Sequence, residues 1–124
     1  MSIPIHEIDH AYLQSLYHND AAVMAQIFEL LIADLPLIQA QLTYYQTNIT
    51  DPTLFEYIHK HKTSFAFVGL KAITTMMNDF EKNRDTYTDN ETIQLGLNEI
   101  KSTIQLASTH IIKYYATLQQ QLGK

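Results

Sequence analysis

A row of apolar residues along the last third of the chain constrains the fold more than any other feature. The row recurs in steps of four and three, as one face of a long helix does, through Ile93, Leu97, Ile100, Ile104, Ala107, Ile111, Tyr114 and Leu118. The preceding segment, Thr88-Asp-Asn-Glu91, is typical of a capping box at a helix N-terminus. A stripe of this kind marks a helix that packs nearly antiparallel in a bundle.

Turn-forming residues are too scarce for an all-β fold. The 124 residues include only 3 glycines and 3 prolines, so the chain has few turns and long helices. This length fits a single domain, and we therefore treat residues 1–124 as one helical domain. We expect an all-α fold, an antiparallel four-helix bundle with a short extra N-terminal helix over about 5–17.

The three middle helices are predicted from their caps and apolar faces. Asn19 or Asp20 caps a helix that runs to about residue 46 and continues through Pro36 with a kink. Asp51-Pro52 starts the next helix, and Gly69 separates it from another that ends near Asn83. The expected core residues of these helices are Val23, Ile27, Leu30, Leu31, Leu35, Ile38 and Leu42, then Leu54, Ile58, Phe65 and Val68, then Leu70, Ile73, Met77 and Phe80.

The charge balance argues against two classes of partner. The chain has 8 Lys and Arg against 13 Asp and Glu, a net charge of -5, so neither nucleic acid nor an anionic membrane surface is an expected partner. The most apolar stretch, residues 21–42, is interrupted by Glu29, Asp34 and three glutamines, which argues against a membrane span. MSIPIHEIDH does not resemble a secretory signal. We expect a soluble, cytoplasmic monomer.

The N-terminal segment contains His6-Glu-Ile-Asp-His10, which matches the zinc motif H-E-x-x-H. Two histidines four residues apart on a helix can chelate a metal. Zinc proteases place this motif on a central helix beneath a sheet and add a third ligand, whereas here it lies at the start of a small helical chain. We therefore expect no metal site and no cofactor in this protein, and Ile8 on this helix to pack against the bundle.

The third predicted helix presents a histidine outside its apolar face. His59 shares a face with Phe55, Glu56, Lys62 and Thr63, away from the predicted core stripe. A neutral imidazole is a competent nucleophile, and a lysine one turn on would partly balance the charge of a phosphoryl group bound to it. His59 is therefore the candidate reactive residue.

This region resembles the histidine phosphotransfer (HPt) family. The family motif places a Lys three residues and a Gly ten residues after the phosphorylated His. Here Ile58-His59-Lys60-His61-Lys62-Thr63 leads to Gly69-Leu70 and then Ile73, Met77 and Phe80-Glu81. Upstream, Asn19-Asp20, Val23, Phe28, Leu31, Asp34-Leu35-Pro36 and Leu42 look like the family's first long helix, so the likeness covers roughly residues 8–120.

The resemblance implies a phosphorelay function. His59 would take a phosphoryl group from the aspartyl phosphate of a response-regulator receiver domain and pass it to another receiver. Lys62 would stabilise the phosphoryl group, and Gly69 would allow the next helix to turn or pack closely. The chain would have no kinase activity of its own: the receiver supplies Mg²⁺, and a hybrid histidine kinase is a further possible partner. The implied docking surface comprises Phe55, Lys60, Ala66 and Lys71.

Two positions depart from the family pattern. Thr63 stands where the family usually has Gly. Its side chain is a steric obstacle to a partner, a hydroxyl beside the phosphoryl group, or a hydroxyl bonded back to the helix backbone. His61 replaces an apolar residue, and we expect it to be partly buried and hydrogen-bonded. Thr63 keeps open the alternative of a pseudo-HPt module that binds a receiver or kinase without carrying phosphate. An unrelated helical adaptor is the third possibility.

Overall fold

The computed structural model describes residues 8–123, and these are all-helical, with no strand among them. Five α-helices and one short 3₁₀ helix follow one another along the chain. They are α1 (His10–Tyr17), α2 (Ala21–Thr47), α3 (Thr53–Ala66), α4 (Lys71–Lys82), η1 (Arg84–Thr86) and α5 (Asn90–Gln121).

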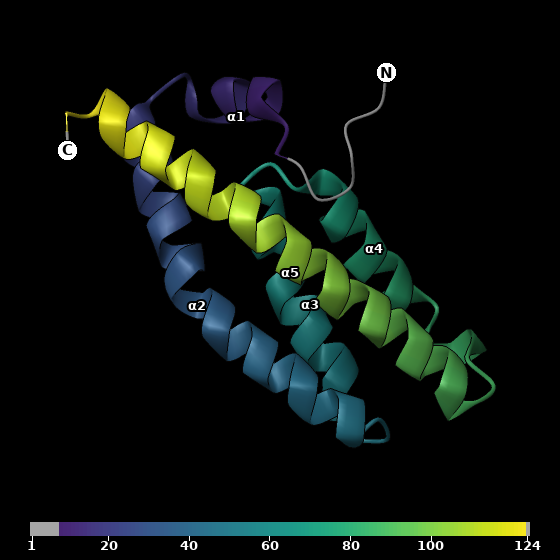
Figure 1. Ribbon diagram of the computed structural model, residues 1–124. Coiled ribbons are helices and arrows are strands. Elements are labelled where there is room, and N and C mark those ends of the chain that lie inside the picture. The colour runs from purple at the N-terminus through teal and green to yellow at the C-terminus, as the bar shows by residue number, and fades with distance from the viewer. Residues whose placement is uncertain (1–7, 124) are drawn as a thin grey trace.

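The four longer helices reverse direction at each connection (Figure 1). α2 packs mainly against α5, and α3 packs mainly against α4. α1 lies across one end, near the C-terminal part of α5, where the His10 ring is hydrogen-bonded to the Tyr114 hydroxyl. The α3–α4 hairpin and the α2–α5 pair enclose one apolar core.

The predicted core faces of α3, α4 and α5 are confirmed. On α3 and its C-terminal extension, Leu54, Ile58, Phe65 and Val68 are fully buried. The predicted residues Leu70, Ile73, Met77 and Phe80 are also buried, as are Leu97, Ile100, Ile104, Ala107, Ile111 and Leu118 on α5. Ile93 and Tyr114 pack at the edge of this core and are partly exposed.

The predicted core face of α2 is wrong at two positions. Val23 and Leu30 are 39% and 67% exposed, and the buried face includes Met24, Ala25 and Phe28 instead. α2 carries apolar residues around most of its circumference, so periodicity alone does not fix which of them face the core. Leu31, Leu35, Ile38 and Leu42 are buried as predicted, and the helix continues through Pro36.

The first helix is shorter than predicted. It begins at His10, where the Asp9 carboxylate accepts a hydrogen bond from the Tyr12 amide, so the predicted helical start at residue 5 is wrong for the residues described. His6 lies outside the described residues. Because Ile8 and Asp9 are not helical, His10 is not preceded by the helical turn that a helical H-E-x-x-H motif requires.

Side-chain caps define two other helix starts. Asp20 caps α2 as predicted, by accepting hydrogen bonds from the Ala22 and Val23 amides. For α5 the cap is Asp89, which accepts from the Thr92 amide at 2.8 Å, rather than the predicted Thr88. Both residues offer a side-chain oxygen, and the extended backbone of Asp89 places its carboxylate over the first turn.

Gly69 makes the sharp turn between α3 and α4. Its φ of +79° lies in the left-handed region that glycine adopts without steric cost. The Asp9 amide donates a hydrogen bond to the Gly69 carbonyl at 3.0 Å, which ties the segment before α1 to this turn. Gly69 therefore permits both the turn and a close backbone contact.

α2 meets the length and composition criteria for a membrane-spanning helix, with a mean hydropathy of 1.8 in its most apolar window. The core helix of a soluble protein meets the same criteria. α2 contributes eight buried residues to the core described above. The expectation that the chain does not span a membrane therefore stays a prediction.

Candidate functional site

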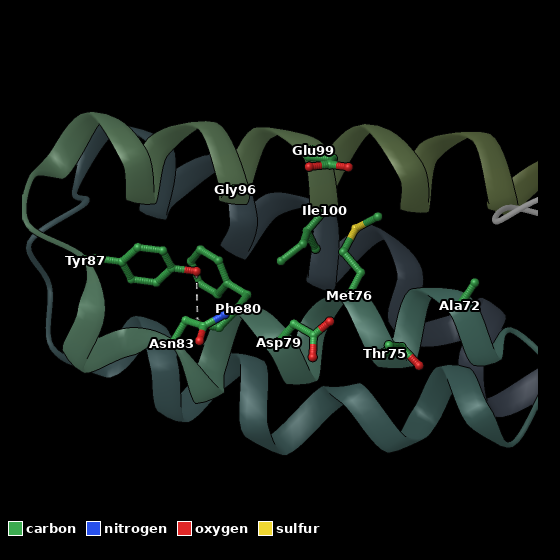
Figure 2. A pocket seen from close by; sticks show the side chains of 10 residues that line it. All are labelled: Ala72, Thr75, Met76, Asp79, Phe80, Asn83, Tyr87, Gly96, Glu99 and Ile100. Atoms are coloured by element: carbon green, nitrogen blue, oxygen red, sulfur yellow. Dashed lines mark hydrogen bonds between the residues drawn. The ribbon is translucent and has the colours of Figure 1, made fainter.

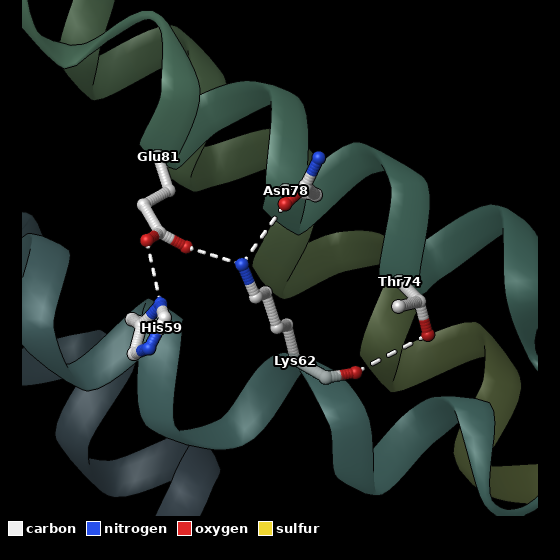
Figure 3. A network of polar contacts seen from close by, with 5 residues as sticks. All are labelled: His59, Lys62, Thr74, Asn78 and Glu81. Atoms are coloured by element: carbon white, nitrogen blue, oxygen red, sulfur yellow. Dashed lines mark hydrogen bonds and ion pairs between the residues drawn. The ribbon is translucent and has the colours of Figure 1, made fainter.

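His59 and Glu81 form a hydrogen-bonded pair between α3 and α4 (Figure 3). The Nδ1 atom of His59 lies 2.6 Å from Oε1 of Glu81. The His59 side chain is 67% exposed and the Glu81 side chain 23% exposed. Nε2, the other ring nitrogen, points away from Glu81. The mid-helix histidine is therefore exposed, as the sequence predicts, but it is fixed by a partner that the sequence analysis did not identify.

The ionisation of Glu81 determines which nitrogen of His59 carries the proton. Burial acts to raise the pKa of the Glu81 carboxyl, but hydrogen bonds from Lys62 and His59 outweigh it and hold that pKa below its ordinary value. An ionised carboxylate can only accept a hydrogen bond, so Nδ1 must be the donor. In the neutral ring, Nε2 then holds a free lone pair on the side away from Glu81.

Lys62 lies beside this pair and is held by α4. Its Nζ atom donates to Oε2 of Glu81 at 2.8 Å and to Oδ1 of Asn78 at 2.9 Å. The Lys62 side chain is only 17% exposed. Glu81 therefore bridges the imidazole and the ammonium group, one carboxylate oxygen to each.

The antiparallel arrangement of α3 and α4 explains why these residues meet. His59 and Glu81 are each eleven residues from Leu70, and Lys62 and Asn78 are each eight residues from it. A hairpin folded at this point pairs residues that are equally distant from its turn. The Thr74 hydroxyl adds a further link, because it donates to the Lys62 carbonyl at 3.2 Å. The same symmetry, read from the sequence with Leu70, next to Gly69, as the centre of the turn, would have identified Glu81.

A surface cavity of about 390 Å³ opens next to His59 and is lined also by Phe55, Glu56, Glu81, Lys82 and Arg84. The Phe55 ring stacks on Phe80 with 5.1 Å between ring centroids. The guanidinium of Arg84 lies over the Phe55 ring, 5.3 Å from its centroid. Arg84 and Lys82 thus bring positive charge to the histidine from a segment that the sequence analysis did not nominate.

The structure places the other nominated residues at different distances from this site. Thr63 and Lys60 are exposed on α3 within one turn of His59, and Ala66 is half-buried further along the helix. Lys71 begins α4 at the other end of the hairpin, and its ammonium lies 4.0 Å from the centroid of the Tyr12 ring. Lys71 is therefore not part of the cluster around His59.

His61 is half-buried, as predicted, on the side of α3 that faces α2. Its ring packs against Tyr57 with 4.4 Å between centroids. Burial, together with the positive charge of Lys60, lowers the pKa of His61, and Asp34 partly opposes the shift. The predicted hydrogen bond is not found for His61 within residues 8–123, where the Tyr57 ring is its contact.

The lowered pKa of His61 predicts a pH-dependent contribution to stability. A group whose pKa is depressed by folding favours the folded state above its unfolded pKa, ordinarily about 6.5, and loses that contribution as the pH falls through its folded pKa. Thermal unfolding should therefore show a smaller loss of Tm below pH 6.5 for His61→Gln than for the wild type. His18→Asn, at an exposed residue, is the control, and an equal effect in both variants would contradict the prediction.

A second cavity, of about 410 Å³, lies between α4 and α5 (Figure 2). Asp79 on α4 and Glu99 on α5 line it, with Met76 between them. The Tyr87 hydroxyl, at one end, donates to the Phe80 carbonyl at 3.3 Å. His59 does not line this cavity, so the two sites are separate.

In the described part of the chain, no group of three or more His, Cys, Asp or Glu side chains is arranged to hold a metal ion. Comparison with protein-family models, with curated proteins and with solved structures finds no match to this chain. The functional argument therefore rests on the His59 site itself.

Proposed function

We propose that this chain is a histidine phosphotransfer protein, folded as an antiparallel four-helix bundle with α1 as an extra N-terminal helix. His59 is its phosphoacceptor. It acts as a cytoplasmic monomer between response-regulator receiver domains, and a hybrid histidine kinase is a further partner. The observation that carries this proposal is the His59–Glu81 pair, which fixes the ring and leaves Nε2 free on an exposed face.

The proposed reaction is a direct transfer between nitrogen and oxygen. The Nε2 lone pair of His59 attacks the phosphorus atom of the receiver's aspartyl phosphate. The bond between phosphorus and the aspartate oxygen breaks, and the aspartate leaves as a carboxylate with the bonding electrons. The receiver provides Mg²⁺ and most of the charge stabilisation, while this chain provides an oriented nucleophile and a docking surface.

Glu81 also has a role after the transfer. Because Nδ1 keeps its proton, phosphorylation of Nε2 leaves a positive charge on the ring, and the Glu81 carboxylate balances that charge at 2.6 Å. A protonated ring is a better leaving group than a neutral one, so Glu81 favours onward transfer to the next receiver. The geometry thus supports a relay intermediate rather than a stable phosphate store.

The direct test is to incubate the purified protein with a phosphorylated receiver domain and Mg²⁺. The proposal predicts a phosphate label on this chain that is labile in acid and stable in base, as a phosphohistidine is. No label from a panel of receivers, with measurable binding to one of them, would instead favour the pseudo-HPt module. Thr63, exposed beside His59, would then be the residue to replace by Gly.

Replacement of Lys62 by Ala should slow phosphate uptake without abolishing it. Lys62 orients the carboxylate that holds His59, so its loss weakens the positioning of the ring but leaves Nε2 intact. Single-turnover transfer from the receiver measures the rate. An unchanged rate would remove Lys62 from the site, and Lys71→Ala, at the far end of the hairpin, is the control.

Replacement of Glu81 by Gln should slow uptake about fivefold. The amide oxygen can still accept the Nδ1 proton, but a hydrogen bond to a charged group exceeds a neutral one by about 1 kcal/mol. The control is Glu56→Gln, which removes a carboxylate from the same cavity without breaking the bond to His59. Equal rates for Glu81→Gln and the wild type would show that the charge of Glu81 has no part in the reaction.

A further inference from the structure

The outer face of α2 carries an uninterrupted row of exposed, uncharged side chains. Its large members are seven residues apart: Val23, Leu30, Leu37 and Tyr44, which are 39%, 67%, 68% and 43% exposed. Three smaller or polar exposed residues lie between them, Gln26, Ala33 and Ala40, and a fourth, Thr47, follows Tyr44. We call these eight residues the outer seam of α2.

The seven-residue spacing is the pattern of a helix that pairs with another helix. Positions seven apart drift by only about 20° around a straight helix, so the seam forms one continuous stripe, about 36 Å long at 1.5 Å per residue. Alternation of large and small side chains allows the knobs of a second helix to insert between them. The core of this protein is on the opposite side of α2, so the seam is not required for the fold described above.

A cavity at the edge of the seam favours a cationic side chain. This cavity, of about 300 Å³, is lined by apolar atoms of Ile27, Leu30, Leu31 and Phe67 and has the carboxylate of Asp34 among its polar groups. Phe67 is itself 51% exposed. A lysine or arginine fits such a site, because its aliphatic stem is apolar and its charged end can reach a carboxylate.

The charges along α2 also favour a basic partner. Residues 21–47 contain Glu29 and Asp34 and no Lys or Arg, and the chain as a whole has a net charge of -5. A second copy would bring acidic flanks against acidic flanks, and an anionic membrane would be repelled. A helix with basic residues on either side of its apolar stripe would be attracted instead.

We propose that the outer seam of α2 binds an amphipathic helix of a partner protein, with an apolar heptad stripe flanked by Lys or Arg. One basic side chain of that helix occupies the cavity beside Asp34. The proposal does not depend on phosphotransfer, since it uses no atom of the His59 site.

The test uses two labelled synthetic 21-residue peptides. Both have the same heptad stripe, with leucine at its two core positions. Lysines flank the stripe in one peptide, and glutamates flank it in the other. Fluorescence anisotropy with the full chain measures binding. The lysine peptide should bind at least tenfold more tightly than the glutamate peptide, and the difference should shrink at high salt. Equal binding of the two peptides would overturn the charge argument.

Two double variants locate the binding surface. Leu30→Gln/Leu37→Gln should weaken binding of the lysine peptide about a hundredfold, or about tenfold for each buried leucine. The matched control is Leu95→Gln/Leu106→Gln, which removes two leucines of similar exposure, 63% and 59%, from α5. Equal weakening by both would show nonspecific attraction to an acidic protein and overturn the proposal.

Two other results would identify a different occupant of the seam and would overturn the proposal. A dimer in sedimentation that Leu30→Gln/Leu37→Gln dissociates would show that the seam joins two copies of this chain. If the protein floats with neutral phosphatidylcholine vesicles and the same double variant abolishes this flotation, the seam binds a lipid surface. Asp34→Asn should reduce binding of the lysine peptide but not of the glutamate peptide. Neither a dimer nor a lipid-binding seam predicts this difference.

Discussion

Replacement of His59 by Gln is expected to abolish phosphate uptake and leave the far-UV circular dichroism unchanged. A glutamine amide has no nucleophilic lone pair comparable to that of imidazole Nε2, so the loss should be complete rather than partial. The fold should be unaffected because the His59 side chain is 67% exposed and lies outside the apolar core. Labelling from a phosphorylated receiver, followed by electrophoresis, measures the first effect.

His61→Gln is the matched control for this experiment. His61 lies two residues away on the same helix, half-buried against Tyr57. Within residues 8–123 it has no carboxylate contact like that between His59 and Glu81. It should therefore keep the phosphate label. Label that persists in His59→Gln and disappears in His61→Gln would move the phosphoacceptor to His61. A loss of helix content in His59→Gln would contradict its exposed position.

Replacement of Gly69 by Ala is expected to lower the free energy of unfolding by about 3 kcal/mol. A side chain at a φ of +79° costs about 1–2 kcal/mol, and forcing an extra carbon into a filled space costs about 1–3 kcal/mol. The added Cβ would lie 3.1 Å from Cγ of Leu13 and 3.2 Å from the Asp9 carbonyl oxygen. Both neighbours are fixed, one in the core and one in the backbone.

Urea denaturation and thermal unfolding measure this effect, and the expected decrease in Tm is about 10 °C. Gly123→Ala is the control, because Gly123 has a similar φ of +75° but nothing within 4 Å of an added Cβ. That variant should lose less than half as much stability. Equal losses in the two variants would mean that the contact between the Gly69 turn and the segment before α1 contributes nothing.

The distribution of apolar residues predicted most of the fold. The stripe on α5 and the faces of α3 and α4 were identified because each helix has one apolar side, which only burial can satisfy. α2 was different: its apolar residues surround most of the helix, so Val23 and Leu30 were assigned to the core although they face outward. The start of α1 was also wrong for the residues described, since the Asp9 cap begins that helix at His10.

Some residues of the candidate site were predicted from the sequence, and others were not. His59 and Lys62 were identified from positions on one helix, because local spacing determines which side chains share a face. Glu81, Asn78 and Arg84 were missed, since their approach to α3 depends on how two helices fold back at Gly69. Lys71 was assigned to the docking surface, and the same fold places it at the opposite end of the hairpin from His59.

The sequence by itself determined that this chain is helical, where its main turns lie and that His59 is exposed. These properties depend on residue order within single helices. Only the tertiary structure decided that the histidine has a carboxylate partner, that its Nε2 is the free nitrogen, and that α2 has an uncovered apolar seam. These properties depend on the register and rotation of one helix against another, which the packing of the whole core sets.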